Sequence, residues 1–277
     1  MPTPSNLPTD IRFSYEGGNH GDRRHPMRIE WRQLPHGQIE IPDGGSWILE
    51  LEGRAPVTVR SGEAMVLPRG LRHALGTAGP RTMHTAWAMF CFEDLAGQDM
   101  LAAAGIPPVV PSATGRQLVG IMTELRELDP AAARGELSAL VRRQALGFRM
   151  LELLLAHATV PSIAPPDPEL ARLLPALRHV EANLARPLYT AELARQAYLS
   201  PSRFHSVFKR ALGCSPLAHV RNARLRLAQH LLLATDLPVG EIGARAGFTS
   251  PYYFSRAFRK HLRTTPTAFR QAFRVYR

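Results

Sequence analysis

Cysteine, lysine and long apolar runs are all scarce in this sequence of 277 residues. The two cysteines, Cys91 and Cys214, lie far apart, which excludes a disulfide framework and a four-cysteine zinc site. We expect both thiols to be buried or incidental. No uncharged apolar run is long enough for a transmembrane helix, and the first ten residues have neither the basic nor the apolar region of a secretory signal. We therefore expect a cytoplasmic protein without a membrane partner.

Negative charge is scarce in the C-terminal part of the chain. Residues 1–166 contain 16 Lys+Arg and 17 Asp+Glu, a net charge of −1, whereas residues 167–277 contain 18 and 6, a net charge of +12. The two values add up to the formal charge of +11 of the whole chain. A domain with such an excess attracts a polyanion, and its affinity for nucleic acid depends on salt because binding releases counterions.

Proline marks the domain boundary. Four prolines fall within residues 159–168, and such a segment favours extended structure because proline cannot continue a helix. The chain length suits about two domains. We predict a disordered tail over residues 1–11, an N-terminal domain over 12–158, a linker over 159–168 and a C-terminal domain over 169–277.

Short strands dominate the first hundred residues. Apolar and β-branched runs alternate with glycine and proline turn signals at close spacing, which is typical of an all-β sandwich or barrel. The expected strands cover residues 27–34, 38–41, 46–51, 57–60, 63–67 and 82–92.

Helices are expected after these strands. The apolar spacing predicts helices over residues 94–104 and 117–128, a break at Asp129-Pro130, and a long helix over 131–158 with one apolar side. Such helices could cover an open face of the β structure.

A unit of about twenty residues occurs twice in the C-terminal domain, fifty positions apart. In each copy a Ser-Pro pair begins a helix whose phenylalanines share one face, and the opposite face is polar. This is the layout of a helix-turn-helix, which packs one face in a core and offers the other to a major groove. The matched pairs include Ser200 and Ser250, Phe204 and Phe254, Phe208 and Phe258, Leu212 and Leu262, and Pro216 and Pro266.

The polar faces of the two expected recognition helices predict the DNA contacts. Arginine donates to guanine, serine and histidine make less exclusive base contacts, tyrosine packs on thymine methyls or bonds phosphate, and paired basic residues suit phosphate. A connecting helix over residues 217–234 is about 27 Å long, which can set the two recognition helices about one DNA turn (~34 Å) apart. One chain is therefore expected to read a bipartite major-groove site in double-stranded DNA. The candidate contacts are Ser202, Arg203, His205, Ser206, Lys209 and Arg210 in the first helix, and Tyr252, Tyr253, Ser255, Arg256, Arg259 and Lys260 in the second.

Four stretches allow a more specific assignment of this domain: Arg224–Ala228, Glu241–Gly243, Ala246–Phe248 and Tyr253–Lys260. With their surroundings, roughly one hundred residues, they resemble the DNA-binding part of the AraC/XylS family of transcriptional regulators. The resemblance places Ser202, His205, Ser206, Tyr252 and Arg256 at base-facing positions.

The sequence departs from the family pattern at three places. Gly243 replaces a small alanine, Arg263 stands where a glycine follows the second recognition helix, and His219-Val220 replaces a common aromatic residue. An interior glycine costs a helix about 1 kcal/mol relative to alanine, so a less rigid second half is expected.

The β-rich part resembles the cupin-like sensing domain of the same family, through Gly44–Gly53, Glu63–Gly70 and His73. In that family an L-P-x-G-x-x-H strand closes one side of a ligand-binding barrel. The resemblance implies an α+β protein, with an N-terminal cupin-like β-barrel and helical extension and a C-terminal all-α domain of two helix-turn-helix units joined by a linker helix. It also implies homodimerisation through the helices at 117–158. The candidate ligand contacts, assigned before the strand faces are known, are His25, Trp31, His36, Trp47, His73 and His84.

These patterns predict a sequence-specific DNA-binding transcriptional regulator and no enzyme. A small-molecule effector in the N-terminal domain would shift the DNA-binding units between two arrangements. RNA polymerase is a further expected partner, and the sequence does not separate an activator from a repressor.

Two alternatives stay open. The N-terminal domain could serve only for dimerisation or protein interaction, or a cupin enzyme could be fused to DNA-binding helices. The histidines of the β-rich part are dispersed and contain no His-x-His pair, so we predict no metal and no cofactor.

Overall fold

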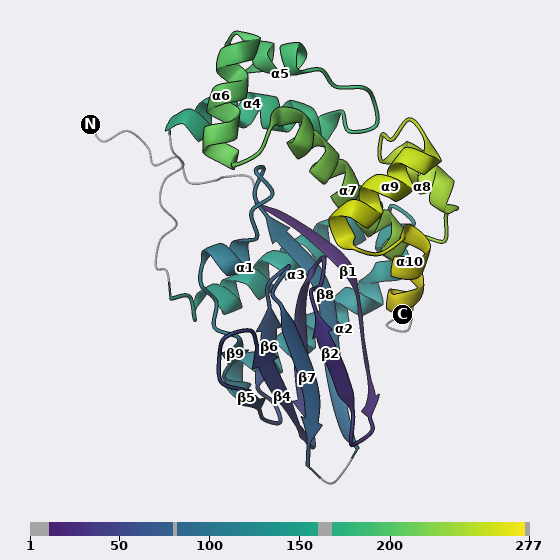
Figure 1. Ribbon diagram of the computed structural model, residues 1–277. Coiled ribbons are helices and arrows are strands. Elements are labelled where there is room, and N and C mark those ends of the chain that lie inside the picture. The colour runs from purple at the N-terminus through teal and green to yellow at the C-terminus, as the bar shows by residue number, and fades with distance from the viewer. Residues whose placement is uncertain (1–10, 80–81, 160–167, 275–277) are drawn as a thin grey trace, which may run out of the picture. The chain divides into compact units, whose positions relative to one another are not determined.

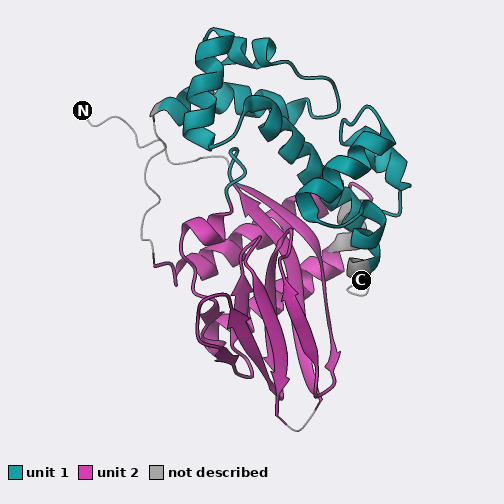
Figure 2. Cartoon of the chain, viewed as in Figure 1, with its two compact units in different colours: residues 1–11, 94–98, 164–275 teal, residues 12–93, 99–163, 276–277 magenta. Residues whose placement is uncertain are grey.

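The computed structural model describes residues 11–79, 82–159 and 168–274, which fall into two compact units (Figure 2). One unit, called here the β unit, comprises residues 12–93, 99–163 and 276–277; the other, the helical unit, comprises residues 1–11, 94–98 and 164–275. The predicted tail at 1–11 and linker at 159–168 lie outside the described residues except at their ends. Within the described part, no helix is long and apolar enough to cross a membrane.

Antiparallel strands build the β unit (Figure 1). One sheet has the strand order β1-β8-β3-β6-β9 and the other the order β2-β7-β4-β5. The strands are β1 Arg12–Arg23, β2 Arg28–Arg32, β3 Gly37–Asp43, β4 Ser46–Leu51, β5 Val57–Val59, β6 Ala64–Leu67, β7 His73–Ala78, β8 Met83–Glu93 and β9 Val109–Val110.

The two sheets form a sandwich and not the closed barrel that the sequence predicted. Among the described strands each sheet keeps its own edges, whereas a barrel needs its first and last strands to pair. Trp47, Leu49 and Leu75 of the smaller sheet share a buried cluster with Met65 and Leu67 of the larger one. The hydrophobic interior therefore lies between two facing sheets.

Sequence patterning missed strands β1, β7 and β9. β1 is rich in glycine, so it lacks the alternation that marks a strand, and its twelve residues are held by pairing with β8. One of these glycines is needed for close approach, because a Cβ on Gly18 would lie 2.6 Å from the carbonyl oxygen of Trp87. The expected strands at 27–34, 38–41, 46–51, 57–60, 63–67 and 82–92 correspond to β2, β3, β4, β5, β6 and β8.

Three helices complete the β unit: α1 Met100–Ala103, α2 Ser112–Ala133 and α3 Leu137–Leu155. α2 and α3 pack on the larger sheet, where Gln144 of α3 donates to the Phe13 carbonyl at 3.2 Å. A Cβ on Gly147 would lie 2.2 Å from the Phe13 ring, so glycine permits this close packing. The expected break at Asp129-Pro130 is wrong, since α2 continues to Ala133 and the chain turns at Gly135, where φ is +81°.

Seven helices make up the described part of the helical unit, and their order agrees with the predicted repeat. They are α4 Pro168–Ala182, α5 Thr190–Gln196, α6 Pro201–Leu212, α7 Pro216–Ala234, α8 Val239–Arg245, α9 Pro251–Leu262 and α10 Pro266–Arg274. Two separate hydrophobic clusters lie within them, one around α4, α5 and α6 and one around α8, α9 and α10.

The connecting helix α7 belongs to both clusters. Val220 and Ala223 pack in the first cluster, whereas Leu225 and Ala228 pack in the second. α7 therefore buries different faces at its two ends, because each end packs in a different cluster. Nineteen residues give this rod a length of about 28 Å.

Candidate nucleic-acid interface

The first helix-turn-helix consists of α5 and α6. Ser200 caps α6 by accepting a hydrogen bond from the backbone N–H of Arg203 at 3.4 Å, and Pro201 follows it. The helix ends at Gly213, whose φ of +69° lies in the left-handed region. At the start of α5 the cap residue is Tyr189, whose side chain makes no capping hydrogen bond.

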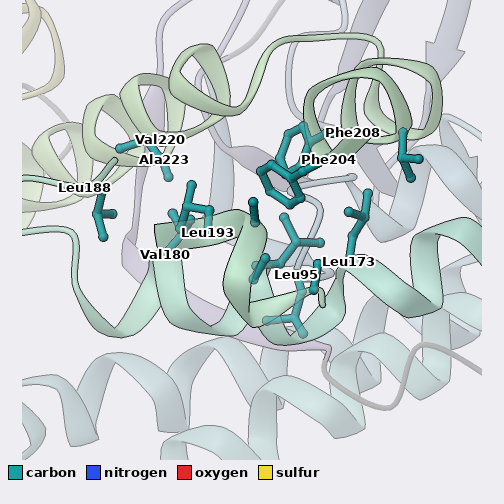
Figure 3. Packing of buried hydrophobic residues seen from close by; sticks show 14 of the residues in the cluster. Leu95, Leu173, Val180, Leu188, Leu193, Phe204, Phe208, Val220 and Ala223 are labelled. Carbon is teal, nitrogen blue, oxygen red and sulfur yellow. The ribbon is translucent and has the colours of Figure 1, made fainter. Parts of the chain in front are cut away.

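Phenylalanine anchors α6 in the unit. Phe204 and Phe208 are fully buried, and their rings lie among Leu193, Val220 and other side chains of the first cluster (Figure 3). The prediction that these phenylalanines are core residues and not stacking platforms for bases is confirmed. His219 is also buried and meets the Phe208 ring edge-on at 5.5 Å, so this histidine fills the place of the family's usual aromatic residue.

The face of α6 opposite these phenylalanines is exposed. Ser206 donates to the backbone carbonyl of Ser202 at 3.2 Å, which leaves oxygen lone pairs of its hydroxyl as acceptors. Arg210 is held by Glu169 of α4, with its Nε 2.6 Å from Oε2 and its Nη2 on the other carboxylate oxygen. The exposed predicted residues are Ser202, Arg203, His205, Ser206, Lys209 and Arg210.

The second helix-turn-helix, α8 and α9, repeats this arrangement. Ser250 accepts from the backbone N–H of Tyr253 at 3.2 Å and precedes Pro251, while Phe254 and Phe258 are fully buried. The predicted turn residue Gly247 has a φ of +86°. α6 and α9 are therefore capped and packed against their cores in the same way.

The outward face of α9 is more aromatic than that of α6. Tyr252 is 75% exposed and Tyr253 is 50% exposed, because the Tyr253 ring lies 6.0 Å from Phe248. Ser255 is half-buried, which makes it the least accessible of the predicted contacts. Arg256, Arg259 and Lys260 are exposed.

Two of the departures from the family pattern have local explanations. A Cβ on Gly243 would lie 2.8 Å from Cδ1 of Phe254, so glycine makes room for the buried ring at the cost of helix propensity. Arg263 ends α9 with a φ of +60°, where a side chain is strained and glycine is not. The second half therefore keeps the geometry of the first with a less favourable terminating residue.

The two helix-turn-helix halves are joined by more than α7. Arg224 of α7 donates from Nε to the Leu184 carbonyl at 2.9 Å and from Nη2 to the Arg186 carbonyl at 2.6 Å. A Cβ on Gly247 would lie 1.9 Å from the same Leu184 oxygen, so only glycine allows this approach. These contacts tie the turn of the second half to the segment after α4 in the first.

An ion-pair cluster links α4, the segment after it and α5 in the first half. Arg186, with His179, surrounds the Glu192 carboxylate, and His179 Nε2 lies 2.7 Å from Oε1. Hydrogen bonds from Arg186 and then His179 lower the pKa of Glu192 to about 2. This acid therefore stays ionised.

The six ligand candidates predicted in the β unit divide into two groups. His36, Trp47 and His73 are buried. The other three lie at the surface. Trp31 of β2 is 40% exposed, exposed His84 of β8 bonds Asp22, and His25, in the bend between β1 and β2, bonds Thr77.

Buried polar residues in β3 and β8 were missed by the sequence reasoning. Gln38 Nε2 donates to Glu40 at 3.1 Å, and Thr85 of β8 lies 3.5 Å from the same carboxyl group. Burial raises the pKa of Glu40 to about 7, against the opposing effect of Arg23 and Arg32. Gln38 and Glu40 are paired with Leu67 and Met65, so they face the interior of the sandwich. The sequence did contain a signal for them: Gln38 and Glu40 are two residues apart in an apolar strand, so they lie on the same face of it.

Buried His36 and His73 lie in the same interior. Burial lowers the pKa of each to about 4. His73 accepts from Arg32 Nε at 3.3 Å through Nε2, and its Nδ1 lies 2.9 Å from the Leu71 carbonyl. Among the residues that the structure describes, no group of three or more His, Cys, Asp or Glu side chains is placed to hold a metal ion.

The C-terminal sequence matches proteins of known role. A helix-turn-helix domain family matches residues 193–272. The regulatory protein PocR of Salmonella typhimurium is 34% identical over 106 residues, which are 38% of this chain and 35% of that protein. The arabinose operon regulatory protein of Escherichia coli is 33% identical over 129 residues, 45% of this chain and 44% of that protein. The matched part is thus less than half the length of these relatives.

Solved structures show the same division. An AraC-type transcriptional regulator from Chromobacterium violaceum is 33% identical and covers 38% of this chain and 93% of its own, with a TM-score of 0.36. The DNA-binding domain of AdpA, solved in complex with a target DNA, is 32% identical and covers 38% and 96%, with a TM-score of 0.37. ToxT from Vibrio cholerae covers 93% of this chain and 96% of its own with a TM-score of 0.51 at 12% identity, a likeness of fold alone. With two complete helix-turn-helix units and these sequence matches, the C-terminal part of the chain belongs to the DNA-binding domains of the AraC/XylS family of helix-turn-helix transcriptional regulators.

Proposed function

We propose that this protein regulates transcription by binding a bipartite site in double-stranded DNA with α6 and α9 of a single chain. One observation carries the proposal: two recognition helices with the same caps and the same buried phenylalanines each present an exposed polar face. α7 is about 28 Å long, a length that suits entry into successive major grooves about 34 Å apart.

Base reading is assigned to the central residues of each exposed face. In α6 these are Ser202, Arg203, His205 and Ser206, and in α9 they are Tyr252, Tyr253, Ser255 and Arg256. The arginines suit guanine, whereas the serines and histidine accept more than one base. Each helix presents an exposed arginine, and α9 adds two exposed tyrosines that α6 lacks.

Phosphate binding is assigned to Lys209, Arg259 and Lys260, which are exposed at the C-terminal ends of the two helices. Arg210 is assigned instead to the packing of α4 against α6, because Glu169 already engages both sides of its guanidinium. The net charge of +12 over residues 167–277 supports a strongly salt-dependent affinity.

Control of DNA binding is assigned to the β unit, through a small-molecule effector. The support is the buried polar set of the sandwich interior, because burying polar and ionisable groups is costly and is common at binding sites. Homodimerisation is assigned to α3, where Leu137, Val141, Phe148 and Leu155 are exposed large apolar side chains. Val141, Phe148 and Leu155 recur every seven residues, the spacing of a helix–helix seam. RNA polymerase is a further proposed partner of the DNA-bound protein.

The apolar seam on α3 also favours a second candidate, in which the β unit only dimerises the chain. DNA binding that no metabolite alters would favour this candidate. Membership of a family of regulators weighs against the third alternative, a cupin enzyme fused to DNA-binding helices.

Selection from a pool of random DNA duplexes tests the proposal directly. The purified chain is expected to enrich two short motifs at a constant separation of about one helical turn. Enrichment of one motif alone would contradict the bipartite reading, and no enrichment at low salt would contradict DNA recognition. Repeating the selection with cell extract would show whether a ligand changes the affinity.

A further inference from the structure

A groove of about 580 Å³ lies in the β unit, between the β6–β7 loop and the segment from α1 to Pro108. Its apolar lining includes Leu51, Val66, Leu101 and Ile106. Small-molecule sites typically have volumes of roughly 300–1,000 Å³ and a mainly apolar lining with a few placed polar groups. The groove fits this description in size, and its lining combines apolar side chains with a larger share of polar groups.

The charged residues that line the groove are mostly arginines. Arg54, Arg69 and Arg72 line it, against one acid, Glu52. The ion pair between Arg72 and Glu52 is 3.6 Å long and joins side chains that are 52% and 70% exposed. An exposed pair of this kind contributes little, so an incoming anion can take the place of Glu52 at small cost.

The loop that carries two of these arginines is held in place before any ligand binds. Gly70 turns the chain with a φ of +76° and donates to the Leu34 carbonyl at 2.9 Å. The backbone N–H of Arg69 donates to Asp99 at 3.1 Å, and its guanidinium donates to Glu93 at 2.7 Å. Because these contacts already order the loop, ligand binding does not lose additional conformational entropy in this loop.

We propose that the groove binds an amphipathic organic acid, with its apolar body on the floor and its carboxylate between Arg54 and Arg72. A highly polar ligand would leave the floor without an apolar partner, and a neutral apolar ligand would leave the arginines without a counter-charge. Arg69 positions the loop through Glu93 and does not contact the ligand in this assignment. The groove does not include the buried polar residues of the sandwich interior, so it is a separate candidate site for the effector. The proposal depends on the proposed function only for an effect on DNA binding.

Isothermal titration of the full-length protein with octanoate and 2-naphthoate tests the site, with 1-octanol and 2-naphthamide as neutral counterparts. At least one acid is expected to bind about tenfold more tightly than its neutral counterpart, because only the acid forms charge-assisted hydrogen bonds. The double variant Arg54→Gln, Arg72→Gln should remove this difference. Glu52→Gln should tighten acid binding, because it removes the group that competes for Arg72.

Arg60→Gln is the matched control, since Arg60 is an exposed arginine of the same unit outside the groove. It is expected to leave every titration unchanged. Equal affinity for acids and neutral counterparts, no binding of either acid, or acid binding that survives the double substitution would each overturn the proposal. DNA binding is measured in parallel on the same preparations. If the protein binds DNA but neither acid, the groove assignment is wrong and the proposed function is unaffected. If the protein does not bind DNA, the proposed function is wrong, whatever the groove binds.

Discussion

At the residue scale, Arg256 and Lys209 carry the same charge but are assigned different partners. Arg256 lies in the middle of the exposed face of α9, whereas Lys209 lies in the last turn of α6. We expect Arg256→Ala to weaken binding of the selected site by about 1–3 kcal/mol and to relax the preference at one base pair. Lys209→Ala should weaken binding to all sequences nearly equally and reduce the salt slope by about 1.

Fluorescence anisotropy with the selected site and single-base variants, at several salt concentrations, measures both effects. Arg60→Ala in the β unit is the control for the loss of an exposed arginine. Unchanged affinity and unchanged base preference in Arg256→Ala would contradict the assignment of α9 as a helix that contacts bases.

Glu40 gives the β unit a pH dependence of its own. Burial raises its pKa to about 7, from 4.5. The unfolded chain then loses this proton at lower pH than the folded chain, so the contribution of Glu40 to stability is full below pH 4.5 and falls as the pH rises towards 7. Glu40→Gln removes the buried charge and keeps an acceptor for Thr85. We expect the variant to gain stability over the wild type as the pH rises from 5 to 8, by as much as about 3 kcal/mol.

Urea unfolding followed by tryptophan fluorescence isolates this effect, because all three tryptophans, Trp31, Trp47 and Trp87, lie in the β unit. His36 and His73, whose pKa values are lowered, act in the opposite direction but are common to both proteins. Glu30→Gln, at an exposed position, should show no such pH-dependent difference. A constant difference between Glu40→Gln and wild type from pH 5 to 8 would contradict the buried-charge explanation.

At the element scale, α3 offers the most direct test of self-association. Val141 is 60% exposed and Phe148 is 42% exposed, seven residues apart on the same helix. Val141→Asp and Phe148→Asp place a charge in the proposed seam, so each should convert a dimer into monomers because an unpaired charge is costly to bury. Sedimentation velocity over a range of protein concentrations gives the measurement.

Leu217→Asp, on a 52% exposed leucine of α7, is the control for adding the same charge elsewhere. It should leave the oligomeric state unchanged. A wild-type protein that stays monomeric at every concentration, or seam variants that dimerise as well as wild type, would remove α3 as the dimer contact.

The elements that the sequence predicted well are those set by neighbouring residues. Ser200-Pro201 and Ser250-Pro251 begin α6 and α9 through local hydrogen bonds, and the phenylalanine spacing makes one face of each helix apolar. β1 was missed because glycines replace the side chains that reveal alternation, and its pairing with β8 joins residues about seventy positions apart. α2 continues through Pro130, where the proline signal alone predicted a break.

At the scale of the whole molecule, the spacing of the DNA half-sites tests whether one chain reads both. Inserting 5 base pairs between the selected motifs rotates them by about half a turn. Binding should fall by at least about tenfold, because one recognition helix then loses its base contacts and each lost contact costs about 1–3 kcal/mol. A 10-base-pair insertion should not restore binding, since α7 and the Arg224 contacts set one separation.

Gel-shift titration of the three duplexes gives the comparison. Recovery of full affinity with the 10-base-pair insertion would contradict single-chain reading, because it would mean that two chains each take one half-site. A duplex with 10 base pairs inserted outside the motifs controls for DNA length.

The sequence alone determined the repeat, its caps, the buried phenylalanines and the charge of the C-terminal part, because these depend on residues close together in the chain. The tertiary structure decided the rest. It separated the strands into two sheets, placed His25, Trp31 and His84 at the surface, buried Glu40 and paired Arg210 with Glu169. It also explained Gly243 by the Phe254 ring that fills the space of a Cβ. Each of these outcomes depends on which distant segments meet, and that is settled by packing of the whole chain.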